Sequence, residues 1–144
     1  MTRQIGLEIN PMPFTAQLLE GEPIILVELS GHLDAQLLRE MYQEIASISQ
    51  SIPGHLYRIT NVQQLESSFH EMLEVAREAS SGTPGSLADP HITMAFVAND
   101  QWIKFTVDTL KQDRFGNLQV PIFRTMNDAL AAIRLQIAQE HKSD

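Results

Sequence analysis

The sequence contains no cysteine, which excludes disulfide bonds, thiolate metal sites and cysteine nucleophiles. It also contains no apolar run of membrane-spanning length, and its first residues, Met1 to Gly6, lack the apolar core of a signal peptide. We therefore expect a cytoplasmic protein with no integral membrane association.

Positive charge is scarce as well. The chain has 10 lysine and arginine residues against 18 aspartate and glutamate residues, for a formal net charge of −8. Such a surface is repelled by phosphate backbones, so nucleic-acid binding is not expected.

Residue patterns for catalysis or metal binding are also missing. No pair among the five histidines has the helical or strand spacing of metal ligands, and no Gly-x-Ser-x-Gly nucleophile motif occurs. The histidines are His32, His55, His70, His91 and His141. The sequence predicts no enzyme, no catalytic residue, no metal site and no cofactor.

What is present is a chain of 144 residues, 43% hydrophobic, which is enough to bury the core of one domain. We expect a single domain over residues 14–139. An extended arm, residues 1–13, would precede it because Pro11 and Pro13 disfavour regular structure there. A frayed tail, residues 140–144, would follow it.

Hydrophobic periodicity predicts alternating strands and helices. Strands are expected at residues 14–19, 24–29, 55–62, 92–98 and 118–123. Asp34, Ser68 and Thr125 are placed to cap the helices that follow them, and Asn99 or Asp100 caps another. The order β-β-α-β-α-β-α-β-α predicts an α/β fold with a mixed, mainly parallel sheet, an antiparallel N-terminal hairpin and about four helices.

Three segments resemble the SpoIIAA-like, or STAS, family. They are ILVELSGHLDAQ (Ile25 to Gln36), ITMAFVANDQWIKF (Ile92 to Phe105) and VPIFRTMNDALAAI (Val120 to Ile133). The matched order of elements covers about Phe14 to Gln139. The resemblance implies a SpoIIAA-like fold and a regulatory, non-enzymatic protein-interaction module similar to anti-sigma-factor antagonists.

The resemblance also implies a candidate site at the start of the second helix. Antagonists of this family are switched by phosphorylation of a serine there, and Ser68 matches that serine, with Ser67 beside it. Glu66 and Phe69 stand where the family has aspartate and glycine, so the phosphoserine motif is degenerate. The favoured hypothesis is therefore a homodimer, or the partner of a kinase-like regulator or of a larger sensor protein.

Ser68 has a structural interpretation too. Ser68 and Glu71 have the spacing of a capping box, in which the serine caps the helix and stabilises it by about 1 kcal/mol.

A second candidate site lies on the third helix. Trp102 and Phe105 fall off the stripe formed by Ile103, Val107 and Leu110. If they were exposed they would mark a dimer contact, a ligand cleft or a lipid surface, although burial is the favoured interpretation. The alternative function is therefore a small-ligand or lipid-binding protein with a pocket near these aromatic residues, between the second and third helices.

Overall fold

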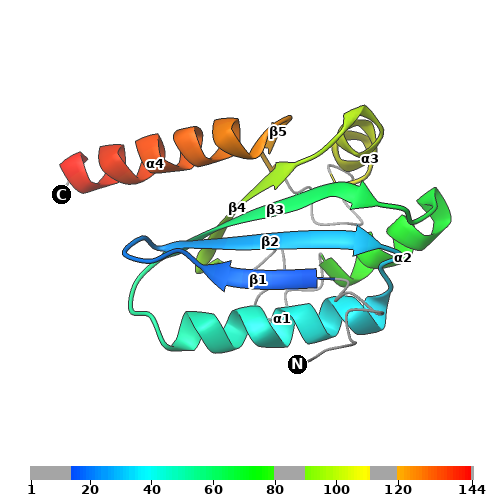
Figure 1. The fold of residues 1–144 in the computed structure, drawn as a ribbon, viewed down its shortest axis with the longest axis horizontal. Helices are drawn as coiled ribbons and strands as arrows, with labels where there is room; N and C mark the ends of the chain where they lie inside the picture. The colour runs from blue at the N-terminus through cyan, green and yellow to red at the C-terminus, as the bar shows by residue number, and fades with distance from the viewer. Residues whose placement is uncertain (1–13, 80–89, 111–119, 144) are drawn as a thin grey trace, which may run out of the picture.

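The computed structural model describes residues 14–79, 90–110 and 120–143; the expected arm, residues 1–13, lies outside them. The strands are β1 (Phe14–Leu18), β2 (Ile24–Gly31), β3 (Leu56–Leu65), β4 (Ile92–Val97) and β5 (Ile122–Phe123). The helices are α1 (Ala35–Gln50), α2 (Phe69–Ala79), α3 (Asp100–Leu110) and α4 (Met126–Ser143) (Figure 1). This is the element order that the sequence predicts.

The strands form one sheet in the order β1-β2-β3-β4-β5. β1 pairs antiparallel with β2, whereas β2, β3, β4 and β5 are mutually parallel. In the register of the central strands, Val27 lies opposite Ala16 on one side and Thr60 on the other. The predicted mixed, mainly parallel sheet with an N-terminal hairpin is confirmed.

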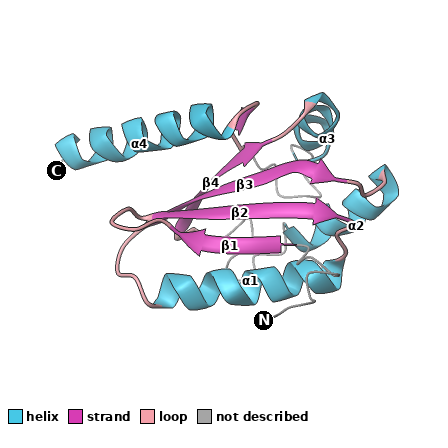
Figure 2. Cartoon of the chain, in the orientation of Figure 1, coloured by secondary structure: helices cyan, strands magenta, loops and turns pink. Residues whose placement is uncertain are grey.

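Three helices cover one face of the sheet (Figure 2). The buried side chains of α1, α2 and α3 join those of the strands in one hydrophobic cluster. Met41 of α1, Val75 of α2 and Trp102 of α3 belong to it. Because every crossover between parallel strands passes over this face, the parallel part of the sheet is wound in a single direction.

The opposite face is covered by α4. Ala129 and Ile133 pack there against β2, β3 and β4, in a second cluster that contains Tyr57 and Ile59. Arg134 reaches back from α4 to the turn between β1 and β2, where its Nε and Nη2 donate to the two carboxylate oxygens of Glu22 at 2.8 and 2.9 Å.

Three boundaries differ from the prediction. β3 continues past residue 62 to Leu65, where it pairs with the end of β2 beyond an irregularity between Glu28 and Ser30. β5 is only two residues long, since Pro121 before it has no N–H for a ladder. α4 continues to Ser143, into the range 140–144 where a frayed tail is predicted, and Glu140 accepts a hydrogen bond from the Tyr57 hydroxyl.

Docking of α4 should contribute strongly to stability. Ile133 is 2% exposed, whereas Leu135, two residues along the same helix, is 60% exposed. Ile133→Ala should lower the free energy of unfolding by about 2–5 kcal/mol, because it leaves a cavity between α4 and the sheet. Leu135→Ala, the matched control, should change it by less than about 0.5 kcal/mol. Urea unfolding measures both, and equal effects would mean that α4 does not pack as described.

Candidate functional site

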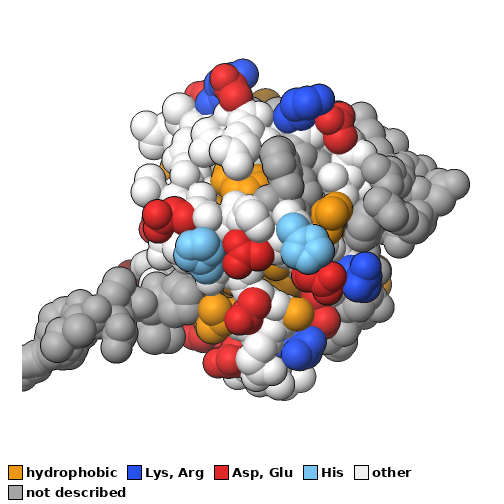
Figure 3. All heavy atoms as spheres, turned by 90° about the vertical axis from the view of Figure 1, so that its right-hand side faces the viewer, with side chains coloured by type: hydrophobic (Ala, Val, Ile, Leu, Met, Phe, Trp, Pro, Cys, Tyr) orange, Lys and Arg blue, Asp and Glu red, His pale blue; other side chains and the backbone are white. Residues whose placement is uncertain are grey.

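The carboxyl ends of β2, β3 and β4 meet at one edge of the sheet, on the right in Figure 1. The chain leaves this edge to enter α1, α2 and α3, so three helix N-termini begin near it. Figure 3 shows this side of the molecule: acidic side chains and two histidines lie near its middle, and basic side chains lie toward its rim. We call it the carboxyl edge.

Two hydrogen bonds join the connections that follow β2 and β3. The N–H of Leu33 donates to Ser67 Oγ at 2.8 Å, and the N–H of Glu66 donates to the carbonyl of Gly31 at 2.8 Å. Ser67 is only 3% exposed. Its hydroxyl therefore satisfies a buried backbone donor and does not face solvent.

Ser68 and Glu71 form the capping box that their spacing predicts. The N–H of Glu71 donates to Ser68 Oγ at 3.1 Å, and the N–H of Ser68 donates to Glu71 Oε1 at 2.7 Å. The two residues thus satisfy backbone donors at the start of α2. Unlike Ser67, Ser68 is exposed.

Glu71 also connects α2 to the end of β2. Its Oε1 lies 3.2 Å from Nδ1 of His32, in the connection before α1. The backbone hydrogen bond from Ser68, followed by the contact with His32, lowers the pKa of Glu71 from its ordinary value. Asp34, between His32 and α1, accepts a hydrogen bond from the N–H of Leu37 and caps α1, as its position predicts.

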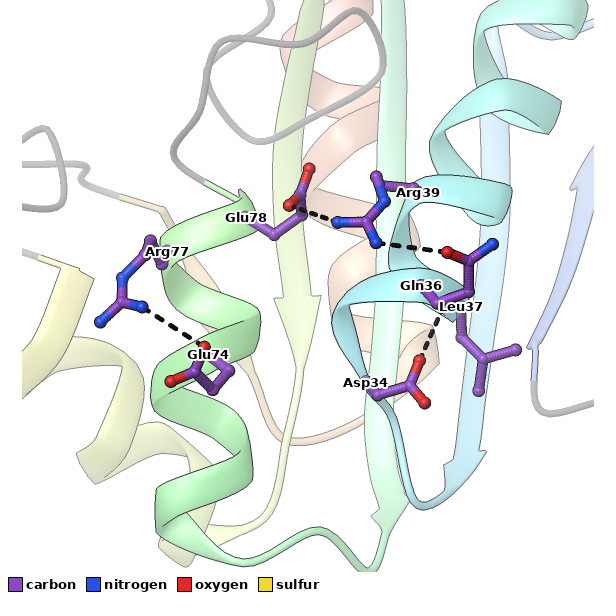
Figure 4. A network of polar contacts seen from close by, with 7 residues as sticks. All are labelled: Asp34, Gln36, Leu37, Arg39, Glu74, Arg77 and Glu78. Atoms are coloured by element: carbon purple, nitrogen blue, oxygen red, sulfur yellow. Dashed lines mark hydrogen bonds and ion pairs between the residues drawn. The ribbon is translucent and has the colours of Figure 1, made fainter.

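An ion pair also joins α1 to α2 (Figure 4). Arg39 of α1 donates to Glu78 of α2 at 3.1 Å and to Gln36 of its own helix at 3.2 Å. These pairs are exposed, and each contributes little to stability.

Beyond β3, the carboxyl edge continues with residues outside the two candidate sites that the sequence predicts. Gln63 donates from Nε2 to the carbonyl of Arg124 at 2.7 Å, which joins the ends of β3 and β5. Arg124 also pairs with Asp100 at the start of α3. Asn99 caps α3 by accepting from the N–H of Trp102 at 3.1 Å. Only the cap at Asn99 has a local sequence signal.

The four residues of the first candidate site therefore differ in accessibility. Glu66 and Ser68 are exposed at the carboxyl edge, and Ser67 is buried. Phe69 begins α2, but its side chain lies outside the described part of the structure. Ser68 is thus the accessible hydroxyl of the adjacent serine pair.

The second candidate site is tested less fully. Trp102 is 2% exposed and belongs to the core beneath the sheet, so it faces the core despite lying off the predicted stripe. The side chains of Phe105 and of the three stripe residues lie outside the described residues. A ligand pocket there stays a prediction.

Within residues 14–79, 90–110 and 120–143, no three histidine, aspartate or glutamate side chains are grouped as metal ligands would be. No helix in these ranges has the length and apolar character needed to cross a membrane.

No protein-family model matches the chain, and no curated protein sequence matches it. Solved structures do. An uncharacterised protein of the DUF3478 family from Shewanella loihica, described as having a SpoIIAA-like fold, matches 82% of this chain and 90% of its own, with a TM-score of 0.53 and 12% identity. An anti-sigma factor antagonist from Mycobacterium paratuberculosis matches 87% and 97%, with a TM-score of 0.48 and 16% identity.

The likeness to the Shewanella loihica protein shows that the chain has a SpoIIAA-like fold, as the resemblance of its segments predicts. At 12% identity this likeness concerns the fold alone.

The two adjacent serines should differ in their effect on stability. Ser67→Ala should lower the free energy of unfolding by about 1–3 kcal/mol, because the buried N–H of Leu33 loses its acceptor. Ser68→Ala removes an exposed cap and should cost about 1 kcal/mol or less. Ser47→Ala, at an exposed position of α1, serves as control. Denaturant unfolding tests the order, and a Ser67 effect no larger than the control would contradict it.

The charge of Glu71 should make stability depend on pH. Glutamine at this position can still complete a capping box, so Glu71→Gln removes the charge and keeps the hydrogen-bonding pattern. A carboxyl whose pKa is lower in the folded state stabilises the fold above its unfolded pKa and loses that contribution as the pH falls through the folded pKa. Wild type should therefore exceed Glu71→Gln in stability at neutral pH.

This difference should disappear below the ordinary glutamate pKa of 4.5. Urea unfolding across this range measures it, with Glu44→Gln, an exposed carboxylate of α1, as the control for loss of one negative charge. If wild type and Glu71→Gln differed in stability by the same amount at every pH, the charge of Glu71 would not be the cause of the difference.

Proposed function

We propose that this protein is a non-enzymatic regulatory module that binds a protein partner through its carboxyl edge. The working surface lies around the first turn of α2 and comprises the exposed residues Glu66, Ser68 and His32 together with the half-buried Glu71. Phosphorylation of Ser68 regulates the binding, a kinase-like regulator being the enzyme that modifies it. The module acts in the cytoplasm.

The observation that carries this proposal is the exposed hydroxyl of Ser68 at the N-terminus of α2. A phosphate there would meet the positive end of the helix dipole and backbone N–H groups, so the fold tolerates it. Its added charge and bulk would then act on a partner's surface. Ser67 is unsuited to this role because its buried hydroxyl is already bound to Leu33.

The winding of the sheet favours a binding module over an enzyme. In open α/β sheets, ligands bind in a crevice at a topological switch point, where the strand order reverses. Here the strands lie in sequence order from β1 to β5, without a reversal. In the part of the chain that is described, the histidine and the two serines at this edge make structural contacts. His32 contacts the carboxylate of Glu71, and both Ser67 and Ser68 accept hydrogen bonds from backbone N–H groups, so none of these contacts is a serine–histidine pair of the catalytic kind.

The charge of the site indicates the chemistry of the partner. Glu66 and Glu71 lie at the carboxyl edge of a chain with a net charge of −8. A partner surface with basic residues would be attracted to this edge, with faster association at low salt.

The test combines modification with binding. Intact-mass analysis of protein purified from its native cells under phosphatase inhibition should find a phosphate that maps to Ser68. A copurifying partner should bind wild type and Ser68→Asp with different affinity. Because aspartate is as good an N-cap as serine, this variant keeps α2 intact, and any change in binding reports on the surface.

Ser47→Asp adds the same charge at an exposed position of α1 and should leave binding unchanged. Equal binding by wild type and Ser68→Asp would eliminate the switch and leave Ser68 as a helix cap. A partner that binds unchanged after Glu66→Lys and His32→Glu would exclude the carboxyl edge as the interface.

A further inference from the structure

β1 is an edge strand whose second side is unpaired within the described sheet. It has β2 as its one neighbour in the strand order, and α1 packs against it from the core side. An unpaired strand edge is a template for pairing with another chain. Which backbone groups it presents follows from the hairpin.

The hairpin fixes the direction of each backbone group in β1. The N–H of Leu19 donates to the carbonyl of Ile24 at 2.9 Å, so these opposed residues form a hydrogen-bonded pair. Such pairs alternate along an antiparallel ladder. Gln17 and Thr15 therefore direct their N–H and C=O groups toward β2, and Phe14, Ala16 and Leu18 direct theirs away from the sheet.

The outward row is self-complementary. If two copies of β1 run antiparallel with Ala16 of each on a twofold axis, Ala16 pairs with Ala16 of the other copy, and Phe14 pairs with Leu18. Every outward N–H then meets a carbonyl, and every outward carbonyl meets an N–H. The side chains of Ala16 and Leu18 are half-buried beside the first core, so the contact would cover apolar area that a single copy exposes.

The composition of β1 permits this contact. The strand reads FTAQL, with no charged residue and no proline, and its register with β2 is continuous over all five residues. Natural edge strands are commonly protected from pairing by charges, proline or bulges. In a chain with a net charge of −8, an uncharged strand is also a place where two copies can approach without opposing charges of the same sign across the ladder.

We propose that two copies of this chain pair through β1, antiparallel and centred on Ala16, so that their sheets join into one continuous sheet. This pairing places a second copy of the chain at the edge of the sheet and is independent of the proposed function. It also specifies which residues oppose each other on the solvent side: Thr15 of one copy lies across from Gln17 of the other.

The absence of cysteine makes this register directly testable. Thr15 and Gln17 are both exposed, so Thr15→Cys and Gln17→Cys leave the core untouched. Directly opposed residues at non-hydrogen-bonded positions have Cα atoms about 4.5 Å apart, within the range of a disulfide. Under mild oxidation, an equal mixture of the two variants should form mixed disulfide-linked dimers. Each variant alone should form few, because its own cysteines are offset diagonally.

Ser47→Cys, exposed on α1, gives the background level of linkage. Sedimentation of the wild-type chain should show a dimer, and Ala16→Pro should return it to a monomer. The N–H of Ala16 faces away from β2, so proline there removes a bond between copies and spares the β1–β2 ladder. Circular dichroism checks that this variant stays folded.

A monomeric wild type over the whole concentration range would overturn the proposal. A wild-type dimer whose mixed cysteine variants link no more than Ser47→Cys would also overturn it, because the interface would then lie elsewhere. Should Ala16→Pro unfold, the cysteine mixture still decides the question.

Discussion

The parallel pairing of β2 with β3 is the constraint on which the rest of the structure depends. Parallel strands need a crossover, so α1 and α2 must both begin at the same edge. At that edge β2 ends in Gly31, whose φ of 68° favours glycine, and its carbonyl accepts the N–H of Glu66. The reciprocal bond from Leu33 to Ser67 closes the junction. These two bonds join the entry of α2 to the end of β2, next to the first turn of α2, where Ser68 is exposed.

The adjacent serines Ser67 and Ser68 have different roles at the start of α2: one holds the backbone in place and the other faces solvent. Ser67 is committed to the fold, since its buried hydroxyl is the acceptor for a backbone N–H that has no strand partner. Ser68 caps α2 from the exposed side, where a charged substituent still suits the helix terminus. A modification at Ser68 can therefore alter the surface without loosening the junction that positions it. The buried Ser67 holds the junction, so the exposed Ser68 is free to carry a modification.

The sequence predicts those features whose causes are local. Element order and the capping box of Ser68 and Glu71 depend on residues a few positions apart, and both are confirmed. The contacts of Ser67 with Leu33 and of His32 with Glu71 join residues 34 and 39 positions apart, so no spacing rule identifies them. The extension of β3 to Leu65 likewise depends on pairing with Gly31. The burial of Arg58 is the hardest of these features to predict. Arg58 is 1% exposed, whereas a charged residue in a strand is ordinarily expected to face solvent.

The uneven distribution of charge separates the two kinds of contact that this fold can make. Self-association of a chain with a net charge of −8 is opposed by repulsion, and this repulsion is weakest where a backbone ladder carries the contact and no charged side chain faces its copy. β1 meets that condition. The carboxyl edge does not, because Glu66 and Glu71 would face like charges across a symmetric contact, whereas a basic partner would be attracted. A neutral edge strand thus suits a second copy, and an acidic helix terminus suits a different protein, so one small sheet can hold both at once.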